Sequence, residues 1–281
     1  MKTILQSSTS EISISDEGPF IIIGERINPT GNKRLSKALT EGDLDYIREL
    51  ARTQVASGAD VLDVNVGVPG LDDTALLPEI VEAVASEVDV PICIDTPNSE
   101  ALASALSKIE GKALVNSVNG EKSSLENVLP LVKDHGAAVI GLTMDDEGIP
   151  STSDGRVKVA GTILEQAAKL GINEEDVVID PLVLTVGADH QAAANTIAAI
   201  EGIHGEFGVN INIGASNVSF GLPERMILNQ AFVALAMGAG ATCAITNASK
   251  MTRTIRATDL LMGKDEFGAR YIQYFRSQQT D

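Results

Sequence analysis

Residues 90–117 read VPICIDTPNSEALASALSKIEGKALVNS, and this stretch contains the repeating unit on which the fold prediction rests. It begins with an apolar run that closes on Asp95, continues into a helix start at Thr-Pro-Asn-Ser, and ends in a second apolar run that contains Asn116. Short continuous runs of this kind, rich in Val and Ile, are typical of strands buried on both faces of a parallel sheet. The stretch therefore predicts a strand, a helix and a second parallel strand.

Runs of the same kind recur on both sides of this unit. Eight are present: FIIIGE (20–25), VLDVN (61–65), VPICID (90–95), ALVNS (113–117), AAVIGLT (137–143), DVVID (176–180), VNINIGAS (209–216) and ATCAIT (241–246). Stretches with apolar residues at three- and four-residue spacing lie between them, as at 44–55 and 125–132, and the motifs SGAD, HGAA and AGAT each put a glycine between a helix and the next strand. Eight such units in 281 residues predict a (β/α)8 TIM barrel. A doubly wound open sheet is the alternative, but no G-x-G-x-x-G follows the first strand.

The chain shows one domain preceded by a short extension. Residues 1–18 are polar and lack clear periodicity, so we expect an N-terminal extension without regular structure, followed by a barrel over residues 19–281. No linker or low-complexity segment divides that region.

Composition excludes several classes of function. The formal charge of −18 would repel a nucleic-acid backbone, and aromatic residues are only 3% of the chain, with no tryptophan for base stacking. No apolar run is long enough for a membrane span, and the first residues are too polar and acidic for a signal peptide, so we expect a cytoplasmic protein that binds no membrane. The two cysteines, Cys93 and Cys243, lie in apolar runs and are interpreted as small buried residues. None of the three histidines stands at ligand spacing, so we expect no metal site.

The chemistry of a barrel enzyme lies at the carboxyl ends of its strands. The residues there are carboxylates, amides and hydroxyls with a single arginine: Glu25, Arg26, Asn28, Asp63, Asn65, Asp95, Asn116, Thr143, Asp180, Ser216, Asn217, Thr246 and Asn247. A set without His, Cys or Lys is poorly equipped for nucleophilic catalysis or Schiff-base chemistry. It suits the recognition of a flat heterocycle that displays both hydrogen-bond donors and acceptors, such as a reduced pterin.

Each of these residues also has a purely structural interpretation. Asp95 could take part in capping the following helix, and Asp180, which precedes Pro181, could be a turn residue. Asn116 and Asp63 could belong to an internal hydrogen-bond network. The coincidence of Asp, Asn and Asp at the ends of three strands favours function.

The strand-end motifs together resemble a known family. They are IGERIN (23–28), LDVNVG (62–67), CIDT (93–96), VNSVNGE (115–121), IGLTMDDEGIP (140–150), VIDPLVL (178–184) and GASNVSFGLP (214–223). The chain is similar to the pterin-binding methyltransferases that act on methyltetrahydrofolate and a corrinoid protein, including the folate module of cobalamin-dependent methionine synthase. Dihydropteroate synthase is a more distant relative, and the combination of IGERIN with SNVSFGLP points to the methyl-transfer branch.

The resemblance implies transfer of a methyl group between N5 of tetrahydrofolate and the cobalt of a corrinoid, such as cobalamin, on a partner protein. It further implies that Asp95, Asn116 and Asp180 hydrogen-bond the pterin ring and that Asn217 reaches N5. Gly214 would allow close backbone approach, and Asp63 would belong to a polar network near N5. Because no side chain at the mouth looks able to act as a strong acid at neutral pH, we expect the proton for N5 to arrive through water.

Several alternatives stay open at this stage. Phe220, three residues beyond Asn217, agrees with the methionine-synthase module and not with the acetyl-CoA-pathway enzyme, which leaves the corrinoid partner undecided. Because the chain lacks the other domains of methionine synthase, a free-standing enzyme that carries methyl from corrinoid to tetrahydrofolate during demethylation of glycine betaine or another methylated amine is one possibility. An acetyl-CoA-pathway enzyme, a folate-binding module without catalysis and a dihydropteroate synthase are the others, although Arg225 alone is a weak phosphate site. Related enzymes are homodimers, and we expect the same here.

Overall fold

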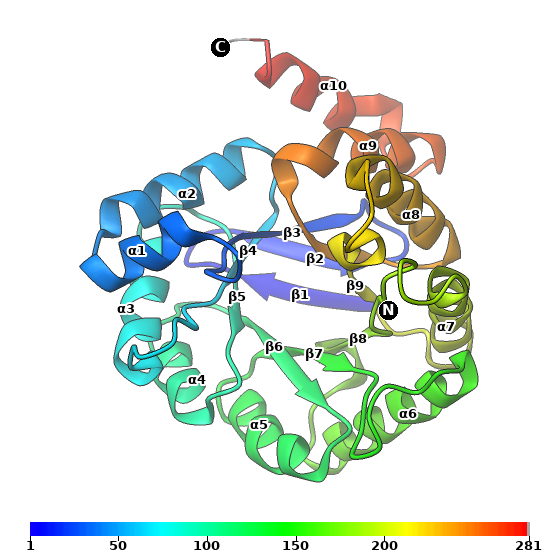
Figure 1. Ribbon diagram of the computed structural model, residues 1–281, viewed down its shortest axis with the longest axis horizontal. Helices are drawn as coiled ribbons and strands as arrows, with labels where there is room; N and C mark the ends of the chain where they lie inside the picture. Colours follow the sequence, from blue (N-terminus) through cyan, green and yellow to red (C-terminus); the bar gives the residue numbers. More distant parts are fainter. Residues whose placement is uncertain (280–281) are drawn as a thin grey trace.

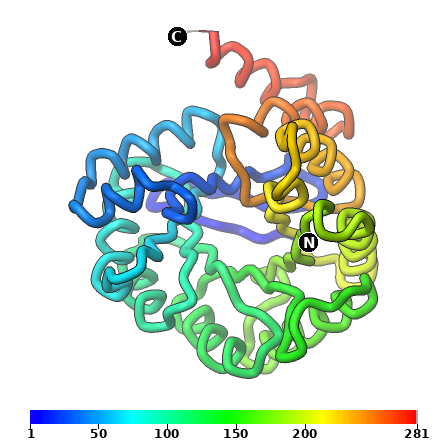
Figure 2. Tube along the Cα trace, in the orientation of Figure 1, coloured from blue at the N-terminus to red at the C-terminus, as the bar shows by residue number. Residues whose placement is uncertain are grey.

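The central sheet of the computed structural model, which describes residues 1–279, consists of eight parallel strands with helices packed on the outer side (Figure 1). The strands are β3 (Ile21–Ile27), β4 (Val61–Val64), β5 (Ile92–Asp95), β6 (Leu114–Asn119), β7 (Ala138–Leu142), β8 (Val177–Asp180), β9 (Asn212–Gly214) and β10 (Cys243–Thr246). The helices of the outer layer are α1 (Lys33–Glu41), α2 (Leu44–Ala56), α3 (Asp73–Ala85), α4 (Ser99–Leu106), α5 (Lys122–Asp134), α6 (Ser153–Lys169), α7 (Ala192–Phe207), α8 (Arg225–Ala239), α9 (Ala248–Leu261) and α10 (Ala269–Ser277). Figure 2 shows the chain passing round the ring in sequence order.

The sheet closes on itself. Its strand order is β8-β7-β6-β5-β4-β3-β10-β9, and a parallel bridge between Ile179 and Ile211 joins the two ends. The Ile179 amide donates to the Asn210 carbonyl at 2.9 Å across this seam. The prediction of a (β/α)8 barrel is therefore confirmed, and the open-sheet alternative is excluded.

Successive side chains on each strand point alternately into and out of the barrel, so the apolar core has two parts. Ile21 and Ile23 point into the barrel, where they pack with Cys93, Cys243 and other interior residues. Ile22 and its equivalents on the other strands face outward into the larger core between sheet and helices. Because successive side chains alternate, the next inward residue of β3 after Ile23 is Glu25, at the carboxyl end of the strand.

Local sequence fixes many helix boundaries. Side chains of Asn32, Asp43 and Asn98 accept hydrogen bonds from backbone amides in the first turns of α1, α2 and α4. The glycines of SGAD, HGAA and AGAT lie between helix and strand as predicted, with positive φ angles at Gly58 (98°), Gly136 (60°) and Gly240 (117°). These left-handed positions favour glycine because it carries no Cβ.

Residues 1–18, to which the sequence assigned no structure, are in part regular. They contain an antiparallel hairpin of β1 (Lys2–Gln6) and β2 (Glu11–Ser15), whose Leu5 and Ile14 are fully buried in the barrel-interior cluster. Asn210 donates to the Thr3 hydroxyl and to the Ile14 carbonyl, both at 2.9 Å. The hairpin therefore closes the amino-terminal end of the barrel, opposite the strand ends expected to carry the chemistry.

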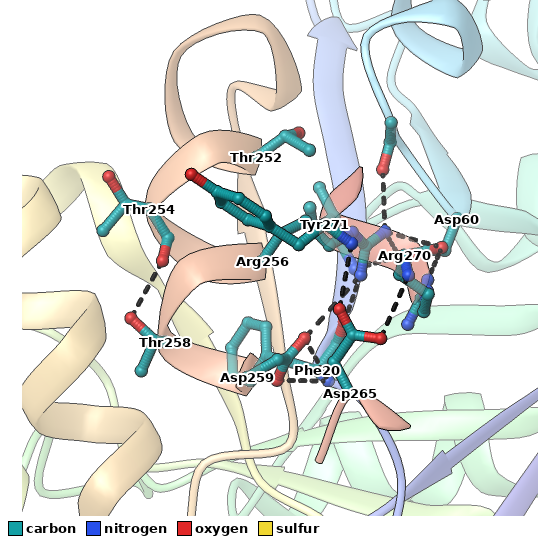
Figure 3. Close-up of polar contacts among 12 residues, drawn as sticks. Phe20, Asp60, Thr252, Thr254, Arg256, Thr258, Asp259, Asp265, Arg270 and Tyr271 are labelled. Carbon is teal, nitrogen blue, oxygen red and sulfur yellow. Dashed lines mark hydrogen bonds and ion pairs between the residues drawn. The ribbon is translucent and has the colours of Figure 1, made fainter. Parts of the chain in front are cut away.

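An ion-pair network anchors α9 and α10 at this same end (Figure 3). The Asp60 carboxylate, just before β4, accepts hydrogen bonds from Arg256 of α9 at 3.1 Å and from Arg270 of α10 at 2.7 Å. Asp259 accepts from the Phe20 amide at 3.0 Å, and Asp265 caps the start of α10 through the amides of Arg270 and Tyr271.

Among residues 1–279, no helix is long and apolar enough to span a membrane.

Candidate active site at the barrel mouth

Four carboxylates lie on the inner face of the barrel at its carboxyl end. They are Glu25, Asp63, Asp95 and Asp180, which lie within the last three residues of β3, β4, β5 and β8. Asp63 is 1% exposed and Asp180 5%, whereas Glu25 and Asp95 are half-buried. The expectation that polar residues at the carboxyl ends of strands face the barrel mouth holds for these side chains, because each follows an inward apolar residue two positions earlier on its strand.

Three of the carboxylates are held by an asparagine amide. Asn116 Nδ2 donates to Asp63 Oδ1 at 3.1 Å, Asn65 Nδ2 donates to Asp95 Oδ2 at 3.0 Å, and Asn212 Nδ2 donates to Asp180 Oδ2 at 2.7 Å. Since the amide nitrogen of Asn116 is occupied by Asp63, its Oδ1 is left to accept a hydrogen bond from a ligand.

The structural interpretations considered for Asp95 and Asp180 fare differently. α4 is capped by Asn98, so Asp95 is not its cap. Asp180 does act in a turn, because its Oδ1 accepts from the Leu182 amide at 2.8 Å. Its other oxygen, Oδ2, accepts a hydrogen bond from Asn212 on the adjacent strand β9. The turn therefore explains the contact of only one of the two carboxylate oxygens.

Burial raises the proton affinity of the carboxyl groups at this end of the barrel. It raises the pKa of Asp63 to about 7, assisted by the nearby charge of Asp95, and raises the pKa of Asp180 to about 6. The pKa values of Asp95 and Glu25 are also raised, chiefly by burial. Asp63 is therefore a candidate proton carrier that the sequence did not indicate.

Gly214 and Asn217 lie on the part of the barrel mouth formed by the end of β9 and the segment that follows it. Asn217 belongs to the short 3-10 helix η2 (Ala215–Ser219) after β9, is exposed, and makes no side-chain hydrogen bond to another residue in 1–279. A Cβ on Gly214 would lie 3.0 Å from Asn217 Nδ2, so the absence of a side chain at 214 gives the amide its space. Ser216 Oγ donates to Glu25 at 3.5 Å, which links this wall to β3.

Not all predicted residues line one cavity. Asp95 and Asn116, which are register partners on β5 and β6, line a polar cavity of about 350 Å³ that continues between α4 and α5 over serine and asparagine side chains. Asp180, Gly214 and Asn217 lie outside that cavity, on the β8 and β9 side of the mouth. Half-buried Leu142 and Ile245, also inward-facing, supply apolar surface between the polar walls.

Sequence reasoning missed two members of this arrangement. Asn65 was recognised only as a strand-end residue, and Asn212 was read as part of an apolar run. Inward alternation back from Gly214 would have identified Asn212. Within residues 1–279, no group of three or more His, Cys, Asp or Glu is arranged to hold a metal ion, and both cysteines are buried and free.

Comparison with known proteins identifies relatives along most of the chain. Residues 24–247 match the family model described as pterin binding enzyme. The methylcorrinoid:tetrahydrofolate methyltransferase of Eubacterium limosum is 34% identical over 262 residues, which are 92% of this chain and 96% of that protein. The methionine synthase of Mycobacterium tuberculosis is 30% identical over 88% of this chain, but the match spans only 22% of that larger protein.

Solved structures agree on the fold. Yersinia pestis dihydropteroate synthase in complex with a sulfonamide drug superimposes with a TM-score of 0.72 at 16% identity, over 92% of this chain and 99% of that one. The Xanthomonas albilineans dihydropteroate synthase bound to 4-aminobenzoic acid gives 0.70 at 18% identity, over 93% and 98%. At these identities the likeness is one of barrel architecture alone.

Proposed function

The chain belongs to the pterin-binding enzyme family, and from this premise we propose that it is a methyltransferase that moves a methyl group between N5 of tetrahydrofolate and the cobalt of a protein-bound corrinoid. The observation that carries the proposal is the convergence of Asp63, Asp95, Asn116 and Asp180 on the inner face at one end of the barrel. The similarity to the Eubacterium limosum enzyme over nearly the whole of both chains supports the same reaction.

The donor and acceptor set suits a reduced pterin. Asp95 and Asp180 offer carboxylate oxygens to the exocyclic amine and ring N–H groups, and Asn116 offers the amide oxygen that Asp63 leaves free. The apolar surface of Leu142 and Ile245 fits the face of a flat ring. These side chains therefore bind and orient the pterin.

We assign to Asn217 the role of donating a hydrogen bond to N5. A tertiary amine releases its methyl group readily only if the nitrogen gains a proton or a hydrogen-bond donor as the bond breaks. The Asn217 amide, exposed and without a protein partner in the described chain, is free to donate to that nitrogen. The corrinoid supplies the cobalt that gives or receives the methyl group.

We assign to Asp63 the role of exchanging the proton that N5 gains or loses during methyl transfer. Its pKa of about 7 lets it hold a proton at neutral pH and release it over a small change in conditions. Asn116 donates to one carboxyl oxygen at 3.1 Å and the Cys93 thiol also hydrogen-bonds this carboxyl, so the group is held in place to exchange a proton with the network near N5. We propose this role as an alternative to the route through water that the sequence led us to expect.

For the direction of transfer, we propose corrinoid to tetrahydrofolate in a demethylation pathway for glycine betaine or another methylated amine, since the Eubacterium limosum relative is named for that direction. The contacts of Arg225, the residue considered from the sequence as a phosphate site, disfavour dihydropteroate synthesis. Its guanidinium donates to the Ser216 carbonyl at 2.8 Å and to Ser219 Oγ at 3.1 Å, and is thereby committed to its own loop.

We also propose a cytoplasmic homodimer. Phe267 is 92% exposed and Leu261 87%, and the nearby Phe275 is more than half exposed. Large apolar side chains exposed together are uncommon on monomers, and the same patch on two copies forms a two-fold contact. Phe267→Ser should convert a dimer to a monomer in sedimentation equilibrium without loss of the circular dichroism spectrum.

Spectrophotometry of cob(I)alamin mixed with 5-methyltetrahydrofolate, run in both directions, tests the main proposal. Consumption of cob(I)alamin in one direction and its formation from methylcobalamin and tetrahydrofolate in the other are the expected results. Folate binding without transfer to either free cobalamin or a corrinoid protein would indicate a binding module instead. Condensation of a pterin pyrophosphate with 4-aminobenzoate would indicate a dihydropteroate synthase.

A further inference from the structure

Asn212 is a fully buried side chain whose two polar atoms are both engaged. Its Nδ2 donates to Asp180 Oδ2 at 2.7 Å, and its Oδ1 accepts from the Cys243 thiol at a sulfur–oxygen distance of 3.6 Å. Burial raises the pKa of Cys243, so the thiol keeps its proton and can act only as the donor in this contact. The amide is thereby held with its nitrogen toward the carboxylate.

Asp180 is surrounded by contacts that favour its ionised form, while its burial opposes that form. The second carboxylate oxygen accepts from the Leu182 amide at 2.8 Å, and the charge of buried Arg156 also favours the ionised form. Arg156 itself donates to the Pro181 and Leu182 carbonyls, so it holds the turn that supplies this amide. Against these contacts stands nearly complete burial, which favours the neutral acid.

The same arrangement occurs on the opposite wall of the mouth. Asn65, the residue that follows β4, donates to Asp95 Oδ2 on the neighbouring strand at 3.0 Å. Asp95 is half-buried and faces the carboxyl group of Asp63, so burial again opposes its ionised form. In both pairs, an asparagine on an adjacent strand holds one oxygen of a carboxylate and leaves lone pairs directed elsewhere.

We propose that Asn212 and Asn65 are positioning residues that hold Asp180 and Asp95 oriented and negatively charged for the N–H groups of the pterin. The inference rests on the proposed function, because it assigns a purpose to carboxylates taken to bind that ring. A carboxylate accepts a pair of parallel N–H donors only when its plane is fixed and both oxygens are unprotonated. An amide on one oxygen achieves both, since it restricts rotation and stabilises the charge.

The coupling between Asn212 and Asp180 can be measured without any folate. Carbon-13 NMR of protein labelled at aspartate side-chain carboxyls gives the Asp180 titration, assigned by its loss in Asp180→Asn. In Asn212→Leu the midpoint should move upward by about one pH unit, as expected for loss of one hydrogen bond to a charged group. Asn210→Leu is the matched control, because Asn210 is also a buried interior asparagine but contacts the hairpin instead.

The consequence for binding is measured by calorimetry with 5-methyltetrahydrofolate between pH 5.5 and 8.5. If the midpoint moves from about 6 to about 7, the ionised fraction of Asp180 falls about twofold at pH 7 and about fivefold at pH 6, and affinity should fall in the same proportion. Affinity should largely recover at pH 8.5, because Asp180 is then ionised in both proteins and the Leu182 amide still restricts its rotation. Asn210→Leu can lower thermal stability but should leave this pH profile unchanged, and Asn65→Leu should weaken binding in the same sense through Asp95.

The outcomes separate the two proposals. If the wild-type protein binds no folate, the proposed function fails, whereas the carboxyl titration still reports on the Asn212 contact. If the wild-type protein binds folate but Asn212→Leu shows an unshifted Asp180 titration, or a loss of affinity equal at all pH values, the positioning role is refuted.

Discussion

Replacing Asp63 by asparagine should stabilise the protein at neutral and alkaline pH while it impairs methyl transfer. Burial raises the pKa of this carboxyl from 3.8 to about 7. Between those values the folded state binds the proton more tightly than the unfolded chain, so the stability contributed by this group is fully present below pH 3.8 and is lost as the pH rises toward 7. Asparagine has nearly the same volume and never ionises, so the variant lacks this loss.

The magnitude follows from the shift. About three pKa units correspond to about 4 kcal/mol, which is the largest gain in the free energy of unfolding that Asp63→Asn can give at pH 8. Asn116 can keep its hydrogen bond to a carbonyl oxygen at position 63, so little is lost in exchange. The gain should shrink steadily toward pH 4, where wild type and variant both carry a neutral side chain.

Urea unfolding of both proteins at intervals between pH 4 and pH 8 measures this difference. The exposed Asp146 provides the control, since Asp146→Asn removes the same charge without burial. In parallel, the rate of methyl transfer should fall in Asp63→Asn and lose its dependence on pH near 7. A stability difference that is constant across this range would refute the assignment of the buried proton to Asp63.

Three further changes test other parts of the structure. Asn217→Ala should lower the methyl-transfer rate about 100-fold or more in the cob(I)alamin assay, with folate affinity by calorimetry changed little, because the amide is proposed to act on N5 in the transition state. Gly214→Ala places a Cβ 3.0 Å from Asn217 Nδ2 and should slow transfer about tenfold through displacement of that amide, with unfolding unaffected. Asp60→Ala leaves Arg256 and Arg270 without their shared carboxylate and should cost about 3 kcal/mol in urea unfolding, while folate affinity stays the same.

Local sequence was sufficient to predict the barrel and the placement of its polar mouth. Each apolar run became a strand, and alternation then required Asp95 and Asn116 to share a face because they are register partners on adjacent strands. Left-handed glycines such as Gly58 followed from the same local rule. These features depend on residues close in sequence, where periodicity is informative.

Features that depend on distant contacts were not predictable in this way. The N-terminal hairpin is held by Asn210, about 200 residues away in sequence, through contacts with Thr3 and Ile14. Its own segments, five residues each, look too polar to form a core. Likewise, the proton affinity of Asp63 arises from its depth in the barrel and from Asp95 on the next strand. Neither cause can be read from the letters around position 63.

The two ends of the barrel differ in how buried charge is compensated. At the amino-terminal end, Asp60 is matched by two arginines, so its charge is compensated within the protein. At the mouth, Glu25, Asp63, Asp95 and Asp180 have raised pKa values because burial outweighs the support that their amide and arginine neighbours provide. A ligand rich in N–H donors would supply the missing partners, which is why we propose the pterin site at the uncompensated end.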